Sequence, residues 1–239
     1  MQHIIKQLSA LCLLALASCA STQNPRDEVA PDQQPDRGVR IDVGAFYRST
    51  EVSEVEFKDP VHAEGKTQDE SRQRVGVHAS VGIQPVRGYI EVFGEDFLDA
   101  SGVGFALGVE GSPLVHTFEN GVELSVPYQL GGAIVSLDDA KALGVTNDLG
   151  YIELNLDVGV SARWGAWVPA VGVSNRGLRG VMQFPGEVDD DFDDDDISAD
   201  LGSAYLELAY RPEYRGIDIV LRGMGGDETG FQLSGKWGF

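Results

Sequence analysis

The feature that most limits the fold of this sequence is a strict alternation of apolar and polar residues over long segments. From Ile152 to Trp164 apolar side chains occupy every second position, and Glu153, Asp157 and Arg163 are among the residues between them. The same alternation recurs in residues 75–83, 204–210 and 231–239. A period of two indicates strands with one apolar face. Long stretches with helical periodicity are absent, so the sequence predicts an all-β protein.

The alternation marks ten segments whose ends we expect to be correct within a few residues. Several run to about ten residues or more, whereas an ordinary strand has about five or six. Strands of about 9–11 residues suit a barrel that crosses a bilayer. We therefore expect an antiparallel up-and-down β-barrel of eight to ten transmembrane strands over residues 40–239. The ten segments are 40–49, 72–84, 87–97, 101–110, 122–135, 151–164, 167–176, 201–211, 216–224 and 229–239.

The connections between these segments alternate in length. Those after the second, sixth and eighth are short, and those after the first, fifth and seventh are long. Short turns at one end and long loops at the other resemble outer-membrane β-barrel proteins. Two connections depart from this pattern: residues 225–228 are too short, and residues 111–121 too long. In the latter, Asn120-Gly121 is a strong turn signal that indicates an extra hairpin.

Aromatic residues support the same resemblance. Trp164, Trp167 and Trp237 all fall at the end with short turns, with Tyr210 beside them. Such rings prefer the boundary between headgroups and hydrocarbon. The chain ends on Phe239 after an alternating segment. This resembles the C-terminal signal of outer-membrane barrels, which implies recognition by the barrel insertion machinery.

Alternation alone leaves open which face of the barrel is inside. A soluble lipocalin-like barrel turns its apolar face inward and holds a ligand, whereas a membrane barrel turns it outward to lipid. Lysine is rare here, and the polar face carries small residues with charges of both signs, which could form a network that plugs a narrow lumen. We therefore expect the apolar face to point outward. The charges are Glu153, Asp157, Arg163, Glu207, Arg211, Asp218, Arg222 and Lys236.

The first 18 residues have the pattern of a signal peptide. A polar start with Lys6 precedes an apolar run that is too short to span a bilayer. The run ends in Leu16-Ala17-Ser18-Cys19, which resembles the lipobox of bacterial lipoproteins. That resemblance implies cleavage before Cys19 and acylation of this cysteine, and Ala20 after it implies forwarding to the outer membrane. An ordinary signal peptide cut at a nearby small residue is the alternative.

Residues 19–39 follow as a lipidated N-terminus and tether. They are polar, rich in proline, aspartate and glutamine, and almost free of large apolar side chains. Such a segment cannot bury enough apolar surface to fold, so we expect it to be disordered. An integral barrel does not need a lipid anchor, which makes the combination unusual.

An acidic run at residues 187–196 is the candidate metal site. Asp189, Asp191, Asp193 and Asp195 place oxygen ligands at alternate positions, and hard cations such as calcium favour such ligands. The spacing is not that of an EF-hand. A solvated acidic loop on the outer face is the alternative to a divalent cation that bridges lipopolysaccharide phosphates.

Other chemistries find little support. The net charge of -20 opposes nucleic acid binding, and both cysteines, Cys12 and Cys19, lie in the leader. His62, His78 and His116 are scattered without metal-ligand spacing. No Gly-x-Ser-x-Gly motif or phosphate-binding loop is present. We expect no enzyme, although a hydrolase with Asp, His and Ser at the barrel mouth stays open as a third choice.

These expectations combine into one functional hypothesis. The chain would be a lipid-anchored outer-membrane β-barrel with a structural or adhesive role, or one that passes small solutes. Its partners would be outer-membrane lipid, lipopolysaccharide and the insertion machinery, and no cofactor is expected beyond the possible divalent cation. The alternative is a lipid-anchored soluble barrel that binds an apolar ligand in the periplasm.

Overall fold

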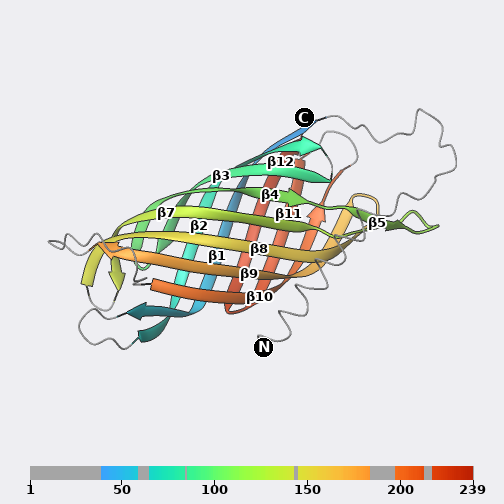
Figure 1. Cartoon of the computed structure of the whole chain (residues 1–239). Coiled ribbons are helices and arrows are strands. Elements are labelled where there is room, and N and C mark those ends of the chain that lie inside the picture. The colour runs from blue at the N-terminus through green and yellow to red at the C-terminus, as the bar shows by residue number, and fades with distance from the viewer. Residues whose placement is uncertain are drawn as a thin grey trace. The chain divides into compact units, whose positions relative to one another are not determined.

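The computed structural model describes residues 39–58, 65–83, 85–142, 145–183, 197–212 and 217–238. These residues contain twelve antiparallel strands in one sheet (Figure 1). In the part of the chain described, no helix is long and apolar enough to cross a membrane. The strands are β1 (Arg40–Lys58), β2 (Gly65–Ile83), β3 (Val86–Phe97), β4 (Ala100–Gly111), β5 (Leu114–Thr117), β6 (Glu123–Ser125), β7 (Tyr128–Ala142), β8 (Val145–Arg163), β9 (Trp167–Gln183), β10 (Ile197–Tyr210), β11 (Ile217–Gly226) and β12 (Glu228–Gly238).

Ten of the described strands close into a ring. Each pairs with its neighbour in the order β1-β2-β3-β4-β7-β8-β9-β10-β11-β12, and β12 returns to β1. All ten predicted segments are therefore present, and the all-β barrel prediction is confirmed.

The extra hairpin predicted from Asn120-Gly121 is also confirmed. β5 and β6 form it, and β6 pairs with the end of β8. In its turn Gly121 has a φ of 80°, which glycine adopts without steric cost, and its N–H donates to the carbonyl of Phe118 at 2.9 Å.

Several connections were predicted incorrectly. β1, β2, β7, β8, β9 and β10 all extend into the segments expected to be long loops. Only residues 143–144 separate β7 from β8, and β7 begins at Tyr128, whereas the prediction began at 122. The extensions carry acidic residues such as Glu51, Glu56 and Asp148 on the exposed side of the strands. Because polar residues dominate there, these strand ends resemble loops in the sequence.

The apolar face points outward, as predicted. Leu154 and Leu206 are 66% and 70% exposed on the barrel exterior, whereas the neighbouring Glu153 is only 4% exposed. Large apolar side chains on all ten ring strands share this exposure, which water would oppose and lipid would favour. The molecule is therefore a membrane-spanning barrel of the outer-membrane type, and the soluble alternative with an apolar ligand pocket is not supported.

Aromatic rings fit against glycines inside the barrel. A Cβ at Gly104 would lie 2.3 Å from the ring of Phe93, and one at Gly172 would lie 2.4 Å from the ring of Tyr205. Each ring therefore occupies the space that a side chain on the next strand would need. Such pairs fix register and curvature in a sheet.

The barrel wall loses strands toward the end where β1 connects to β2 and β9 to β10, here called the outer end; the opposite end, with the short turns after β2 and β8, is called the short-turn end. β3 and β4 stop at a turn formed by Leu98 and Asp99, and β11 and β12 stop at Asp227. Beyond the β11–β12 turn, β1 pairs directly with β10 through Glu56 and Ser198. Because the diameter of a barrel falls with strand number, the described wall narrows there.

Candidate functional site: the barrel lumen

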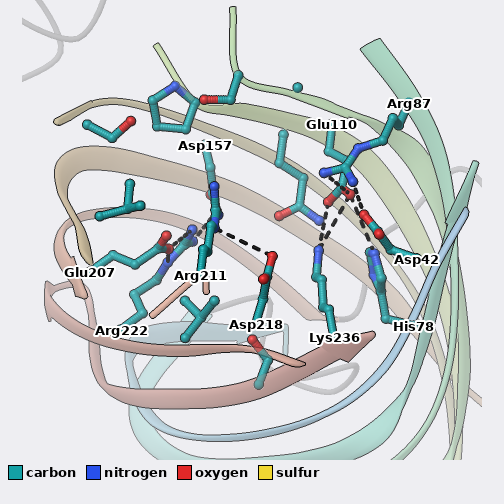
Figure 2. A pocket seen from close by; sticks show the side chains of 18 of the residues that line it. Asp42, His78, Arg87, Glu110, Asp157, Glu207, Arg211, Asp218, Arg222 and Lys236 are labelled. Atoms are coloured by element: carbon teal, nitrogen blue, oxygen red, sulfur yellow. Dashed lines mark hydrogen bonds and ion pairs between the residues drawn. The ribbon is translucent and has the colours of Figure 1, made fainter. Parts of the chain in front are cut away.

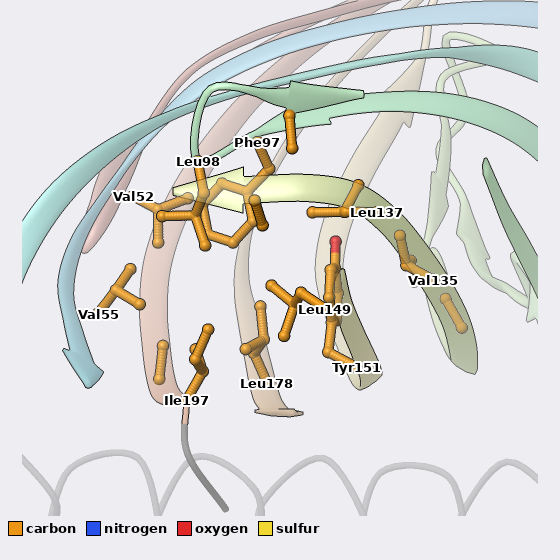
Figure 3. Packing of buried hydrophobic residues seen from close by; sticks show 14 of the residues in the cluster. Val52, Val55, Phe97, Leu98, Val135, Leu137, Leu149, Tyr151, Leu178 and Ile197 are labelled. Atoms are coloured by element: carbon orange, nitrogen blue, oxygen red, sulfur yellow. The ribbon is translucent and has the colours of Figure 1, made fainter. Parts of the chain in front are cut away.

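An apolar cluster fills the outer end of the lumen. Figure 3 shows side chains from opposite walls converging there. Leu98 is only 2% exposed although it lies in a turn, where its φ of 56° is rare for a leucine. We use the name outer apolar cluster for these residues: Val52, Val55, Phe57, Phe97, Leu98, Val135, Leu137, Leu149, Tyr151, Leu178, Ile197 and Leu201.

A layer of buried charges lies next to the outer apolar cluster. Arg72 and Arg74 of β2 donate to Glu95 of β3 and to Glu153 of β8. The Nη2 of Arg74 lies 2.9 Å from a carboxylate oxygen of Glu153 and 3.2 Å from the hydroxyl of Tyr151. Because β2 and β8 are four strands apart in the ring, these bonds cross the lumen.

Other strands join the same layer. Arg176 of β9 donates to Glu228 of β12 at 3.2 Å and lies 4.0 Å from Glu153. Arg48 of β1 donates to the amide oxygen of Gln232. Buried charges are tolerated when they are paired in this way. We call this group the ion-pair layer: Arg48, Arg72, Arg74, Arg176, Glu95, Glu153 and Glu228.

A polar cavity of about 500 Å³ occupies the other half of the lumen and reaches the short turns. Figure 2 shows charged side chains gathered on two of its walls. On one wall Glu110 accepts from Lys236 at 3.1 Å and pairs with Arg87 at 3.1 Å. Arg87 also donates to Asp42. The ring of His78 lies between Glu91 and Glu110 and stacks on Tyr89.

The second wall centres on Arg222. Its guanidinium donates to Glu207 at 2.7 and 2.9 Å and to Asp157 at 2.5 Å, and it covers the ring of Tyr205 at 4.2 Å. Arg211 lies 3.7 Å from Asp218 beside this group. Among the described lining residues, six Arg and Lys side chains face six Asp and Glu side chains, so the fixed charge of the cavity is balanced.

The structure brings together most of the charges singled out from the sequence. Glu153 joins the ion-pair layer, whereas Asp157, Glu207, Arg211, Asp218, Arg222 and Lys236 pair inside the cavity. Arg163 donates to the carbonyl of Gly165 at the short turn. The prediction that charges would form an internal network is confirmed.

Sequence reasoning missed more than half of that network, including Asp42, Arg87 and Glu110 in the cavity. Arg72, Arg74, Arg176, Glu95 and Glu228 were not singled out, yet they form most of the ion-pair layer. Each lies on the inward-facing side of its strand in the alternating pattern. That position was the available signal, because a charge between lipid-facing residues must point into the lumen.

The ring of His78 is held between two carboxylates. Nδ1 lies 3.0 Å from Glu91 and Nε2 lies 3.6 Å from Glu110, and among the described residues no serine hydroxyl is hydrogen-bonded to the ring. His116 instead contacts Phe118 outside the lumen. The described residues also contain no group of three or more His, Cys, Asp or Glu arranged to hold a metal ion.

Three predicted sites lie outside the described residues. They are the lipidation site Cys19, the acidic run with Asp189, Asp191, Asp193 and Asp195, and the terminal Phe239. Their predictions therefore stay as they were made, as do those for the signal peptide and the tether.

The tryptophans lie where the sequence predicted. Trp164, Trp167 and Trp237 are 78%, 51% and 54% exposed on the exterior at the short-turn end. Trp167 packs edge-on against Tyr210 at 5.1 Å between ring centroids. These rings form an aromatic girdle at one border of the lipid-facing surface.

Comparison with known proteins adds general likeness to other barrels. No protein-family model matches the chain. No curated protein matches it either. The transport unit of the autotransporter AIDA-I from Escherichia coli is 10% identical, with 93% of this chain and 96% of that chain covered and a TM-score of 0.40.

Two further solved structures are similar at the same level. The outer membrane protease OmpT from Escherichia coli is 7% identical over 90% of this chain and 97% of that chain, with a TM-score of 0.37. The translocator domain of the autotransporter NalP from Neisseria meningitidis is 10% identical over 99% and 95%, with a TM-score of 0.37. Because these TM-scores are at most 0.40, the barrel is assigned from its own strand pairing and exposed apolar face.

Proposed function

We propose that this protein is an outer-membrane barrel with a sealed lumen, and that its role is structural or adhesive. The observation that carries this proposal is the filling of the lumen by the outer apolar cluster and the ion-pair layer. Leu137, Leu149 and Ile197 are at most 1% exposed, and so is Glu228 beneath them. Water and ions would have to displace packed apolar side chains and break buried ion pairs to pass.

The outer end is the part that such a protein would present. Six of the described strands continue there beyond the lipid-facing belt, which is the band of exposed apolar side chains on the barrel exterior. The exterior of these strand ends carries exposed carboxylates. These exposed carboxylates suit a surface that contacts water. The expected partners are outer-membrane lipid, lipopolysaccharide and the insertion machinery, and the acidic run at 187–196 stays a candidate for a divalent cation.

Passage of small solutes is the second candidate function. The polar cavity favours it, because its volume of about 500 Å³ is large enough for a small solute, which a barrel that only anchors does not need. A solute would enter from the short-turn end. The ion-pair layer and the outer apolar cluster would both have to rearrange before it could leave at the outer end.

Single-channel recording separates the two candidates. The full chain, folded into a planar bilayer, should give no current above that of bare lipid, with a known porin as the positive control. Stable conductance steps from the folded chain would refute the sealed barrel and favour passage.

We further propose that the mature chain is also tethered by lipid on Cys19. The lipobox-like run before that cysteine supports this proposal. The barrel itself would hold the protein in the membrane, so the acyl group would add a second attachment.

A further inference from the structure

The β5–β6 hairpin extends from the short-turn end of the barrel. It continues the β4–β7 pair beyond Pro113 and Pro127, and its second strand pairs with residues 161–163 of β8. In Figure 1 β5 reaches past the end of the ring. Among the described residues β5 pairs only with β6, and its side chains are exposed.

The strand pairing determines which hairpin side chains share the lipid-facing side. Leu124 pairs with Ala162, which lies on the same face of β8 as Leu154 and Trp164, and His116 pairs with Leu124. Phe118 follows two residues after His116, and its ring packs edge-on against the imidazole at 4.6 Å. The outward face of the hairpin therefore continues the lipid-facing surface of β8.

The hairpin also lies beside the aromatic girdle. Glu123 pairs with Arg163, so continuing the antiparallel register by one residue sets Val122, just before Glu123, across from Trp164, just after Arg163. The N–H of Phe118 donates to the carbonyl of Val122 at 2.8 Å. Phe118 is thus two strands across from Trp164, and both side chains are largely exposed, at 46% and 78%.

We infer that the β5–β6 hairpin is a membrane-docking element whose outward face lies in the headgroup layer of the leaflet at the short-turn end. His116, Phe118 and Leu124 contact lipid there, and the polar turn at Glu119 and Asn120 faces water. This face is continuous with the lipid-facing surface of β8, whether the lumen is sealed or open. Aromatic and amphipathic side chains are most stable at the boundary between headgroups and hydrocarbon. The hairpin therefore fixes the depth at which the barrel lies in the bilayer.

Tryptophan fluorescence in lipid vesicles tests this inference. The full chain carries Trp164→Phe, Trp167→Phe and Trp237→Phe, and Phe118→Trp supplies the only tryptophan. Vesicles of phosphatidylcholine contain either a headgroup nitroxide or bromines deep in the acyl chains. The matched control is Thr117→Trp, on the opposite face of the same strand, and a chain that keeps only Trp167 marks the girdle.

The expected result is blue-shifted emission from the Phe118→Trp variant and strong quenching by the headgroup nitroxide, with weaker quenching by the deep bromines. The Thr117→Trp control should emit at longer wavelength and lose less intensity. Equal, water-like emission from both variants would overturn the inference. So would blue-shifted emission that neither lipid quenches, since a second copy or a protein partner would then cover the hairpin. His116→Trp is a second probe if Phe118→Trp does not fold.

Discussion

Replacing Glu153 with glutamine tests the ion-pair layer directly. The change keeps the shape of the side chain and removes one negative charge. Its carboxylate accepts from both Arg72 and Arg74 and lies 4.0 Å from Arg176. In the layer as defined, four arginines already face three glutamates, so Glu153→Gln would leave two unbalanced positive charges.

The size of the expected loss of stability follows from the burial of this ion pair. The attraction of two charges about 3 Å apart is roughly 5 kcal/mol at an effective dielectric constant of about 20, and desolvation of the carboxylate offsets part of it. Removing one partner of a buried pair typically costs about 3–5 kcal/mol, because the other charge stays buried. The side chain of Glu153 is only 5% exposed, so we expect a loss of stability in this range.

Equilibrium urea unfolding in lipid vesicles, followed by tryptophan fluorescence, measures this loss. Glu207→Gln is the matched control, and we expect it to cost about 1 kcal/mol, because Arg222 keeps Asp157 and the Glu207 side chain, at 13% exposed, is less buried than that of Glu153. Adding Arg74→Gln to Glu153→Gln should restore part of the stability, since it removes one unpaired charge. A loss for Glu153→Gln no larger than that of the control would refute the reasoning.

Three further substitutions test the lipid-facing surface, the contact between Gly104 and Phe93, and the proposed lipid anchor on Cys19. Leu221→Arg places a charge on the lipid-facing side, so the same unfolding assay should show a loss of about 2–4 kcal/mol if the site is near the bilayer centre, and no loss would argue against lipid contact. Gly104→Ala meets the ring of Phe93 and should cost about 1–3 kcal/mol, whereas Gly223→Ala, with open space at its Cβ, should be nearly neutral. Cys19→Ala should abolish incorporation of labelled palmitate while the barrel stays in the membrane fraction; release of the barrel would contradict the membrane-spanning assignment.

The core of each strand could be predicted from the sequence because lipid and lumen impose opposite demands on alternate positions. Residues 152–164 show this most clearly, since a leucine or valine facing lipid alternates with a charge or small residue facing inward. The ten strands of the ring followed from this alternation, whereas the girdle followed from the positions of the tryptophans and the extra hairpin from the Asn120-Gly121 turn signal. Which charge pairs with which could not follow, because Arg74 and Glu153 are 79 residues apart and meet only when the ring closes.

The outer strand ends were missed for a different reason. Beyond the belt the exterior faces water, so exposed positions become acidic and the contrast with lipid is lost. The apolar residues there, such as Val55 and Phe57, are buried in the outer apolar cluster. A segment such as VSEVEFK therefore has inward apolar and outward polar residues, the opposite of the pattern that marked the membrane strands.

Two β-bulges explain how one strand can satisfy both patterns. In β1 the register shifts between Val52 and Val55, where Glu54 has a φ of 59°; in β7 it shifts between Leu137 and Ala140, where Asp139 has the same φ. The N–H of each acidic residue donates to an aspartate on the next strand at 3.3 Å. An extra residue reverses which side of the sheet later side chains face. Odd-numbered residues of β1 point outward before the bulge, and after it Val55 and Phe57 point inward. The bulges therefore allow a lumen lined with charge inside the membrane to become apolar at the outer end, which is the arrangement on which the proposed seal depends.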